Sequence, residues 1–314
     1  MKQTSSCGSR ALSALSALGL FLAVSCSHEA VHSALTGKSN APPAVSKDPI
    51  KYTAIPDKNA TELIEKFRLV SDYLSKELGV AFEYVPTTDY NASIQFFKTG
   101  DVQLAWFGGL TGVQAAEFVP GSRMIAQGKV DPVFKSYFVV NESVKIEKGD
   151  SFPMALKGLK FTFGSEQSTS GRLMPEFFIR ENTKLSPAEF FGMPNAYSGA
   201  HDKTAQLVEA GTFQAGALNY KTYDDMVAQK KLDPAKCKIV WVTPTYPDYN
   251  WTAHPVLESR YGKGFTDKLQ KALVSIKDPV LLEALQRKEG LIPAKNEDWA
   301  PIQRVAADLG FLKP

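Results

Sequence analysis

The stretch FTFGSEQSTSGRLMPEFFIR, residues 161–180, joins a predicted strand to a predicted helix through a loop of hydroxyl side chains. The last four residues of that loop are Ser168, Thr169, Ser170 and Gly171. A helix start leaves backbone N–H groups unpaired and carries partial positive charge, so it accepts an anion without needing a cation. One hydroxyl would be enough for ordinary helix capping, which remains the alternative. Three hydroxyls beside a glycine exceed that need, and they predict a loop that binds a tetrahedral oxyanion.

Two other segments end a predicted strand in small or hydroxyl residues immediately before a helix. They are DVQLAWFGGLTG at 101–112 and NAYSGAHDKT at 195–204. In open α/β sheets such strand ends line one crevice, so we expect the three helix starts to converge on one anion. The phosphate-binding pattern GxxxxGK[ST] of nucleotide-binding loops does not occur.

Short apolar runs alternate with amphipathic stretches from residue 50 onward, which is the pattern of an α/β protein. The helix predicted at 60–78 has its apolar residues on one stripe and ends at Gly79. We expect strands at 50–55, 80–85, 102–107, 134–140, 159–164, 213–218 and 238–243. We expect the remaining helices at 90–99, 111–118, 171–182, 202–210, 220–230, 264–275 and 278–288.

His201 stands at the start of the helix predicted at 202–210. A cation at this end of a helix is opposed by the helix dipole, and a bound anion would remove that penalty. We therefore expect the ring to donate to the anion and to take up a proton near neutral pH. The alternative is a half-buried histidine with a structural hydrogen bond.

Aromatic residues form a third group of candidates. Tyr90, Trp106 and Tyr249 stand where strands meet loops, and each keeps a polar edge that needs a partner. They can wall a pocket while donating O–H or N–H to an anion. The alternative is that they belong to the core, which we expect for Phe107.

Composition excludes several classes of function. The 314 residues carry a net charge of +3 without a basic cluster, so we expect no nucleic-acid partner. We expect no metal, because His254 is isolated and the pair His28 and His32 lies near the N-terminus. We also expect no cofactor and no catalysis: a hydrolase is disfavoured because GxSxG is absent and Asp202 adjoins His201 in the sequence.

The N-terminus has the pattern of an export signal. A short apolar stretch follows Lys2 and Arg10 and ends in LAVSC, which is similar to a bacterial lipoprotein box. We expect a signal peptide at 1–25, a lipidated Cys26, and a flexible tether that fills the rest of 26–47. A plain signal peptide cut after Cys26 is the alternative. Either way Cys237 is the one cysteine left in the body of the protein, so no internal disulfide can form there.

Five segments together resemble the phosphonate/phosphite-type substrate-binding proteins of bacterial ABC importers. In chain order they are AWFGGLTGVQA (105–115), FTFGSEQSTSGRLMP (161–175), YSGAHDKT (197–204), AGALN (215–219) and TPTYPDYNW (243–251). The resemblance runs from about residue 50 to the C-terminus.

The resemblance implies a two-lobed type II periplasmic-binding fold with the ligand in the cleft between the lobes. Lobe one would comprise 48–136 plus 246–314, and lobe two 137–245. Members of the family catalyse nothing; they deliver a captured ligand to a membrane permease and, through it, to an ATPase. The expected location is therefore extracytoplasmic, in the periplasm or at the cell surface, with a lipid anchor in the membrane.

The resemblance also carries ligand-binding roles onto seven positions of this chain. They are Tyr90, Trp106, Ser168, Thr169, Ser170, His201 and, as a departure from the family pattern, Tyr249. Relatives that take aminoalkyl phosphonates carry an acid near this last position, and a tyrosine cannot pair with an ammonium group. We therefore expect a small ligand with an uncharged tail: phosphite first, then methylphosphonate. Phosphate or selenate is the alternative, and a hydrolase or an interaction lipoprotein without a small ligand is less favoured.

Overall fold

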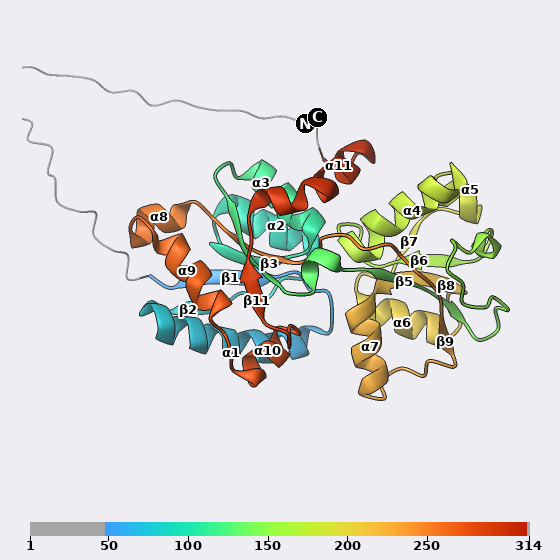
Figure 1. Cartoon of the computed structure of the whole chain (residues 1–314), viewed down its shortest axis with the longest axis horizontal. Helices are drawn as coiled ribbons and strands as arrows, with labels where there is room; N and C mark the ends of the chain where they lie inside the picture. Colours follow the sequence, from blue (N-terminus) through green and yellow to red (C-terminus); the bar gives the residue numbers. More distant parts are fainter. Residues whose placement is uncertain (1–47, 313–314) are drawn as a thin grey trace, which may run out of the picture. The chain divides into compact units, whose positions relative to one another are not determined.

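Two separate sheets organise residues 48–312, the part of the chain that the computed structural model describes (Figure 1). The predicted signal peptide, Cys26 and the tether up to residue 47 lie outside the described residues. None of the described helices is both long enough and apolar enough to cross a membrane.

The first sheet has six strands in the order β11-β4-β10-β3-β1-β2. β1 is parallel to β2 and β3, whereas β10 is antiparallel to both β3 and β4. Helices α1, α9 and α10 pack on one face, and α2, α3 and α11 lie on the other (Figure 1). The strands are β1 (Ile50–Ala54), β2 (Phe82–Tyr84), β3 (Leu104–Phe107), β4 (Arg123–Gly128), β10 (Asn250–Ala253) and β11 (Leu291–Pro293).

The second sheet has five strands in the order β7-β6-β8-β5-β9. The central strand β8 is parallel to β6 and antiparallel to β5, which in turn pairs with β9. Helices α6 and α7 pack on one face, and α4 and α5 lie on the other (Figure 1). The strands are β5 (Ser136–Asn141), β6 (Phe161–Phe163), β7 (Ala196–Tyr197), β8 (Ala215–Asn219) and β9 (Cys237–Val242).

The helices start and stop where local chemistry dictates. The Asn59 side chain accepts the first N–H groups of α1, and Gly79 ends that helix in the left-handed conformation. The α-helices are α1 (Ala60–Leu78), α2 (Tyr90–Thr99), α3 (Gly109–Phe118), α4 (Met174–Thr183), α5 (Pro187–Phe191), α6 (His201–Glu209), α7 (Tyr220–Ala228), α8 (Val256–Tyr261), α9 (Phe265–Val274), α10 (Pro279–Ala284) and α11 (Ala300–Asp308). Short turns of other helix types are η1 (Asp131–Val133), η2 (Met154–Leu156), η3 (Thr169–Leu173) and η4 (Asn296–Trp299).

The chain passes between the two sheets twice, at 129–135 and at 243–249. These two segments pair with each other, because Phe134 and Tyr246 form an antiparallel bridge with N···O distances of 2.9 and 3.0 Å. We call the part built on the first sheet lobe one and the part built on the second sheet lobe two. The α/β class and the two-sheet arrangement predicted from the sequence are confirmed.

Strands β4, β7, β10 and β11 are absent from the sequence prediction. β7 has only two residues, and β11 is a three-residue strand that includes Pro293 and pairs only with β4. Strand β10 is held between β3 and β4 by residues distant in the sequence, so no local pattern predicts it. Tertiary pairing, not propensity, makes these strands.

Candidate functional site

The three helix starts expected to converge do meet in the structure. The N–H of Leu110, in the first turn of α3, donates to Thr169 Oγ1 over 3.0 Å. Ser168 Oγ lies 3.5 Å from Nε2 of His201, the first residue of α6. Since α3 belongs to lobe one and the other two to lobe two, the hydroxyl loop lies between the lobes.

The hydroxyl loop forms one turn of π-helix, η3, ahead of α4. Ser168 starts it by accepting the N–H of Gly171 on its side-chain oxygen, at 3.0 Å. The carbonyl of Ser170 accepts from Ser136 Oγ at 2.6 Å. π-turns recur at functional sites because they widen the helix start. All three hydroxyl residues are buried, at 1–2% exposure.

The last position of the hydroxyl loop, Gly171, has no room for a side chain. A Cβ there would lie 2.9 Å from Ser168 Oγ and 3.0 Å from His201 Cε1. The glycine therefore lets the imidazole of His201 reach the hydroxyl loop.

The ring of His201 is buried and neutral in this structure. Burial lowers its pKa to about 4, and the nearby Asp57 carboxylate only partly offsets this. The N–H of Asn219 donates to Nδ1 over 3.3 Å, so the neutral ring carries its proton on Nε2, the atom that faces Ser168. The sequence predicts a charged ring only with an anion bound; the ring described here is neutral, and it presents an N–H donor to the hydroxyl loop.

Tyr90 opens α2 and is 2% exposed. Its hydroxyl is buried and makes no hydrogen bond of ordinary geometry among the described residues, although the Ser168 hydroxyl lies close enough to lower its pKa. Burial raises its pKa well above the ordinary value, so the hydroxyl stays protonated. An unpaired buried O–H is costly, and a bound oxyanion would satisfy it.

Trp106 and Tyr249, which the sequence predicts as walls of a ligand pocket, stack on each other. Their rings stack with centroids 5.5 Å apart and an interplanar angle of 24°. The Tyr249 hydroxyl donates to Asp57 Oδ2 over 2.8 Å and accepts from Asn219 Nδ2 over 3.0 Å. That hydroxyl is thus committed to protein partners, and the expectation that it donates to the anion gives way to a wall role for the ring.

Three charged residues near the site were not predicted from the sequence. The guanidinium of Arg287 lies 5.1 Å from the Trp106 ring centre and 4.8 Å from that of Tyr249. It pairs with the buried Asp131 at 2.7 Å. Asp57, the acceptor of the Tyr249 hydroxyl, is the second, and no motif around it distinguished it from a surface acid.

Asp248 is the third missed residue and is 1% exposed. Its Oδ1 accepts the first N–H of α3, from Gly109, over 2.9 Å. Its Oδ2 is buried and makes no hydrogen bond of ordinary geometry within the described chain, although the Thr169 and Ser170 hydroxyls lie close enough to the carboxyl to lower its pKa. The DYNW segment that contains it could signal the residue, but its aromatic neighbours are the features that stand out in the sequence.

Comparison with known proteins gives the family. Residues 52–299 match the family model described as "ABC transporter, phosphonate, periplasmic substrate-binding protein". This chain belongs to that family. It is the substrate-binding component of a phosphonate/phosphite-type ABC importer, and membership implies export from the cytoplasm and docking to an ABC permease.

Two relatives of this binding protein are named for a phosphorus oxyanion. A probable ABC transporter phosphite-binding protein, PhnD1 of Prochlorococcus marinus, is 40% identical over 271 residues, 84% of this chain and 91% of the relative. The structure of PhnD1 with methylphosphonate matches with a TM-score of 0.80 and 38% identity, covering 85% of this chain and all of that one. A phosphate-import protein of Mycolicibacterium smegmatis is 28% identical over 61% of this chain and 62% of its own length.

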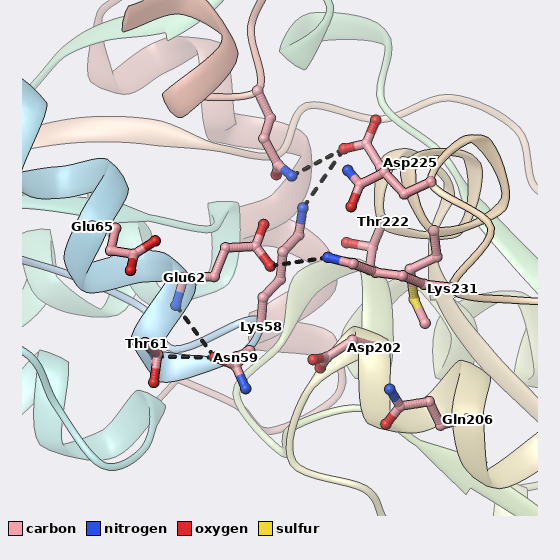
Figure 2. A pocket seen from close by; sticks show the side chains of 13 residues that line it. Lys58, Asn59, Thr61, Glu62, Glu65, Asp202, Gln206, Thr222, Asp225 and Lys231 are labelled. Carbon is pink, nitrogen blue, oxygen red and sulfur yellow. Dashed lines mark hydrogen bonds and ion pairs between the residues drawn. The ribbon is translucent and has the colours of Figure 1, made fainter. Parts of the chain in front are cut away.

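A charged pocket of about 460 Å³ adjoins the site of this binding protein, where α1 faces α7 (Figure 2). Lys58 reaches from the start of α1 to Asp225 of α7, 3.9 Å away, and Gln286 donates to the same carboxylate over 2.9 Å. A second ion pair, Lys231 with Glu62 at 3.9 Å, spans the same opening. Burial lowers the pKa of Lys58 to about 8. Polar contacts thus join the two lobes at this edge of the cleft.

Within residues 48–312, no three His, Cys, Asp or Glu side chains are arranged to hold a metal ion. Cys237 is a free, buried thiol in the core of lobe two.

Proposed function

We propose that this binding protein captures phosphite, or methylphosphonate as the next best ligand, in a cage of neutral donors between its lobes. The observation that carries the proposal is the convergence of three helix starts, those of α3, η3 and α6, on buried hydroxyls and an imidazole N–H. Hydroxyls and helix N-termini replace the hydration shell of an oxyanion. The similarity to a protein named for phosphite and solved with methylphosphonate supports the same choice.

The ligand-binding residues we propose are those carried by the sequence resemblance. Tyr90, Ser168, Thr169, Ser170 and His201 would donate hydrogen bonds, while Trp106 and Tyr249 would form the wall.

Selectivity follows from that wall. Phosphite has a P–H bond where phosphate has a P–OH, and a hydroxyl pressed against ring faces loses its water and finds few acceptors, at a cost of about 1–3 kcal/mol. An aminoethyl tail would bring an ammonium group toward the guanidinium of Arg287, beside the Tyr249 ring. Asp57 is near, but it already accepts the Tyr249 hydroxyl and adjoins Lys58.

We expect the affinity order phosphite, methylphosphonate, phosphate and, last, aminoethylphosphonate. Competition calorimetry at one pH and one salt concentration measures it. Phosphate is the alternative ligand, which the similarity to a phosphate-import protein favours, and selenate is a further one. Equal affinity for phosphate and phosphite, or tight binding of aminoethylphosphonate, would refute the wall argument.

A direct titration separates the classes of function. A binding protein gives saturable one-site heat with phosphite and leaves the anion unchanged, whereas an enzyme consumes it. An interaction lipoprotein gives no heat with any small anion.

The remaining proposals concern location and movement. We infer that Cys26 is lipidated, that 1–25 is removed, and that 26–47 tethers the protein to the membrane in the periplasm or at the cell surface. Mass spectrometry of the membrane fraction tests this, with Cys26→Ser as the unlipidated control.

We also infer that the two lobes move as two bodies about the paired crossing segments and close on the ligand before docking to the permease. Lobe one would be 48–136 with 246–314, and lobe two 137–245.

A further inference from the structure

Asp248 places a carboxylate among groups otherwise suited to hold an anion. Its main chain is held firmly: its N–H donates to the carbonyl of Asp131 over 3.0 Å, and its own carbonyl accepts from Trp299 Nε1. Its side chain flanks the same glycine, Gly108, as the Thr169 hydroxyl. A Cβ on that glycine would lie 3.0 Å from Thr169 Oγ1 and 3.2 Å from Asp248 Oδ1. The carboxyl group therefore belongs to the cage.

Two buried polar atoms at this cage make no hydrogen bond of ordinary geometry within residues 48–312: the Tyr90 hydroxyl, which lies beside Ser168, and Asp248 Oδ2, whose carboxyl lies beside the Thr169 and Ser170 hydroxyls. A tyrosine hydroxyl can donate to an anion oxygen, whereas a carboxylate oxygen needs a proton between itself and the anion. An ionised carboxylate facing an ionised oxyanion would be a like-charge contact in a buried place, which is strongly unfavourable. A single shared proton turns that repulsion into a short hydrogen bond.

The groups around Asp248 favour holding such a proton. Its pKa is raised to about 7, chiefly by burial and in smaller part by the Asp131 carboxylate, against the lowering effect of hydrogen bonds from the Gly109 N–H and the Thr169 and Ser170 hydroxyls. Asp131 is itself paired with Arg287. The nearby phenols Tyr90, Tyr246 and Tyr249 all have pKa values well above their ordinary one and stay neutral.

We propose that the anion enters this site with one proton, held between Asp248 Oδ2 and an anion oxygen. This deepens the proposed function, on which it rests, because it names the ligand class. Phosphite and phosphonates lose their second proton near neutral pH. Their oxygens and the buried carboxyl therefore have similar proton affinities, and one proton is readily shared between them. Selenate and sulfate are anions of strong acids; their oxygens are weak bases and share it poorly.

The first measurement needs no variant. Phosphite is titrated into the wild-type protein at pH 8.5 in two buffers of different ionisation enthalpy, where phosphite is a dianion in solution. We expect an uptake of about one proton per anion bound, and an affinity that falls about tenfold per pH unit between pH 7.5 and 9. No proton uptake would overturn the inference.

The matched variants are Asp248→Asn and His201→Gln. The asparagine keeps an oxygen to accept the Gly109 N–H and presents an amide N–H in place of Oδ2, so it binds the ionised anion directly. We expect its proton uptake to vanish and its phosphite-to-selenate affinity ratio to shrink at least tenfold. His201→Gln should still take up the proton. The reverse pattern, with uptake kept in Asp248→Asn or lost in His201→Gln, would assign the proton elsewhere.

Two different outcomes separate a wrong function from a wrong assignment of the proton. If wild-type protein gives no saturable heat with phosphite or methylphosphonate at pH 6.5, the function itself is wrong. If it binds phosphite but Asp248→Asn keeps the wild-type pH profile and selectivity, the function stands and the shared proton is refuted.

Discussion

Thr169 uses its side-chain oxygen twice. The oxygen accepts the N–H of Leu110 from the opposite lobe, and its own proton lies beside the Asp248 carboxyl, from which it can turn to a bound anion. We expect Thr169→Ala to weaken phosphite binding by about 1.5–3 kcal/mol, the range for hydrogen bonds to charged groups. Calorimetry measures it, and Thr169→Ser, which keeps the hydroxyl, should stay within about threefold of wild type. An unchanged dissociation constant in a folded Thr169→Ala protein would remove the loop from the site.

His201 makes stability depend on pH. Its pKa in the folded protein is about 4, below the ordinary value of 6.5, so the unfolded chain takes up the proton first as pH falls. The stabilisation is complete above pH 6.5 and is lost as pH falls toward 4. We expect wild-type protein to lose about 2 kcal/mol more unfolding free energy between pH 7 and 4.5 than His201→Gln does. Urea unfolding at the two pH values measures this, and equal losses in both proteins would show that the ring is not buried as described.

At the level of elements, the ion pairs between α1 and α7 close one edge of the cleft (Figure 2). Asp225 accepts from Gln286 and pairs with the buried Lys58. Asp225→Asn should weaken ligand binding by about 1 kcal/mol, because closure then buries Lys58 with one of its nearby counter-charges removed and Asp57 left beside it.

Lys231→Met is the matched control for that prediction. It breaks the parallel pair with Glu62, but the Lys231 side chain is 56% exposed, so the pair contributes little. We expect a change in affinity below about 0.5 kcal/mol. If calorimetry gave equal losses of ligand affinity for the two substitutions, the contact between Lys58 and Asp225 would have no special role in lobe closure.

Local signals were sufficient for elements that carry their own caps. α1 and α2 begin and end where the sequence predicted, because Asn59 and Asp89 cap their starts and Gly79 and Gly100 their ends. The hydroxyl loop was also predictable, since its residues are contiguous. Asp248, Arg287 and strand β10 were not, because their roles depend on partners more than 100 residues away.

At the scale of the whole molecule, Arg287 and Asp131 tie the C-terminal part of lobe one to the first crossing segment. Both side chains are at most 3% exposed and lie 2.7 Å apart. Arg287→Met should lower the free energy of unfolding by about 3–5 kcal/mol, because it leaves the buried Asp131 carboxylate unpaired. The thermal midpoint should then fall by roughly 10 °C.

The double variant Arg287→Met with Asp131→Asn tests the cause of that loss. Removing both charges should restore more than half of the lost stability, since no uncompensated charge remains. Additive losses in thermal unfolding would mean that packing against the Trp106 and Tyr249 rings, not charge, is what Arg287 supplies.

The pairing of the two crossing segments also has a consequence for how the chain is made. All five strands of lobe two lie between residues 136 and 242, so that lobe is complete in one uninterrupted stretch. Lobe one is not: β10 fills the gap between β3 and β4 about 145 residues after β3, and β11 follows later still. During synthesis from the N-terminus, the first sheet therefore stays open until the last quarter of the chain has emerged from the ribosome. Contacts this distant form slowly. We expect a nascent chain that completes its first lobe late to stay unfolded for longer, a state that is compatible with export.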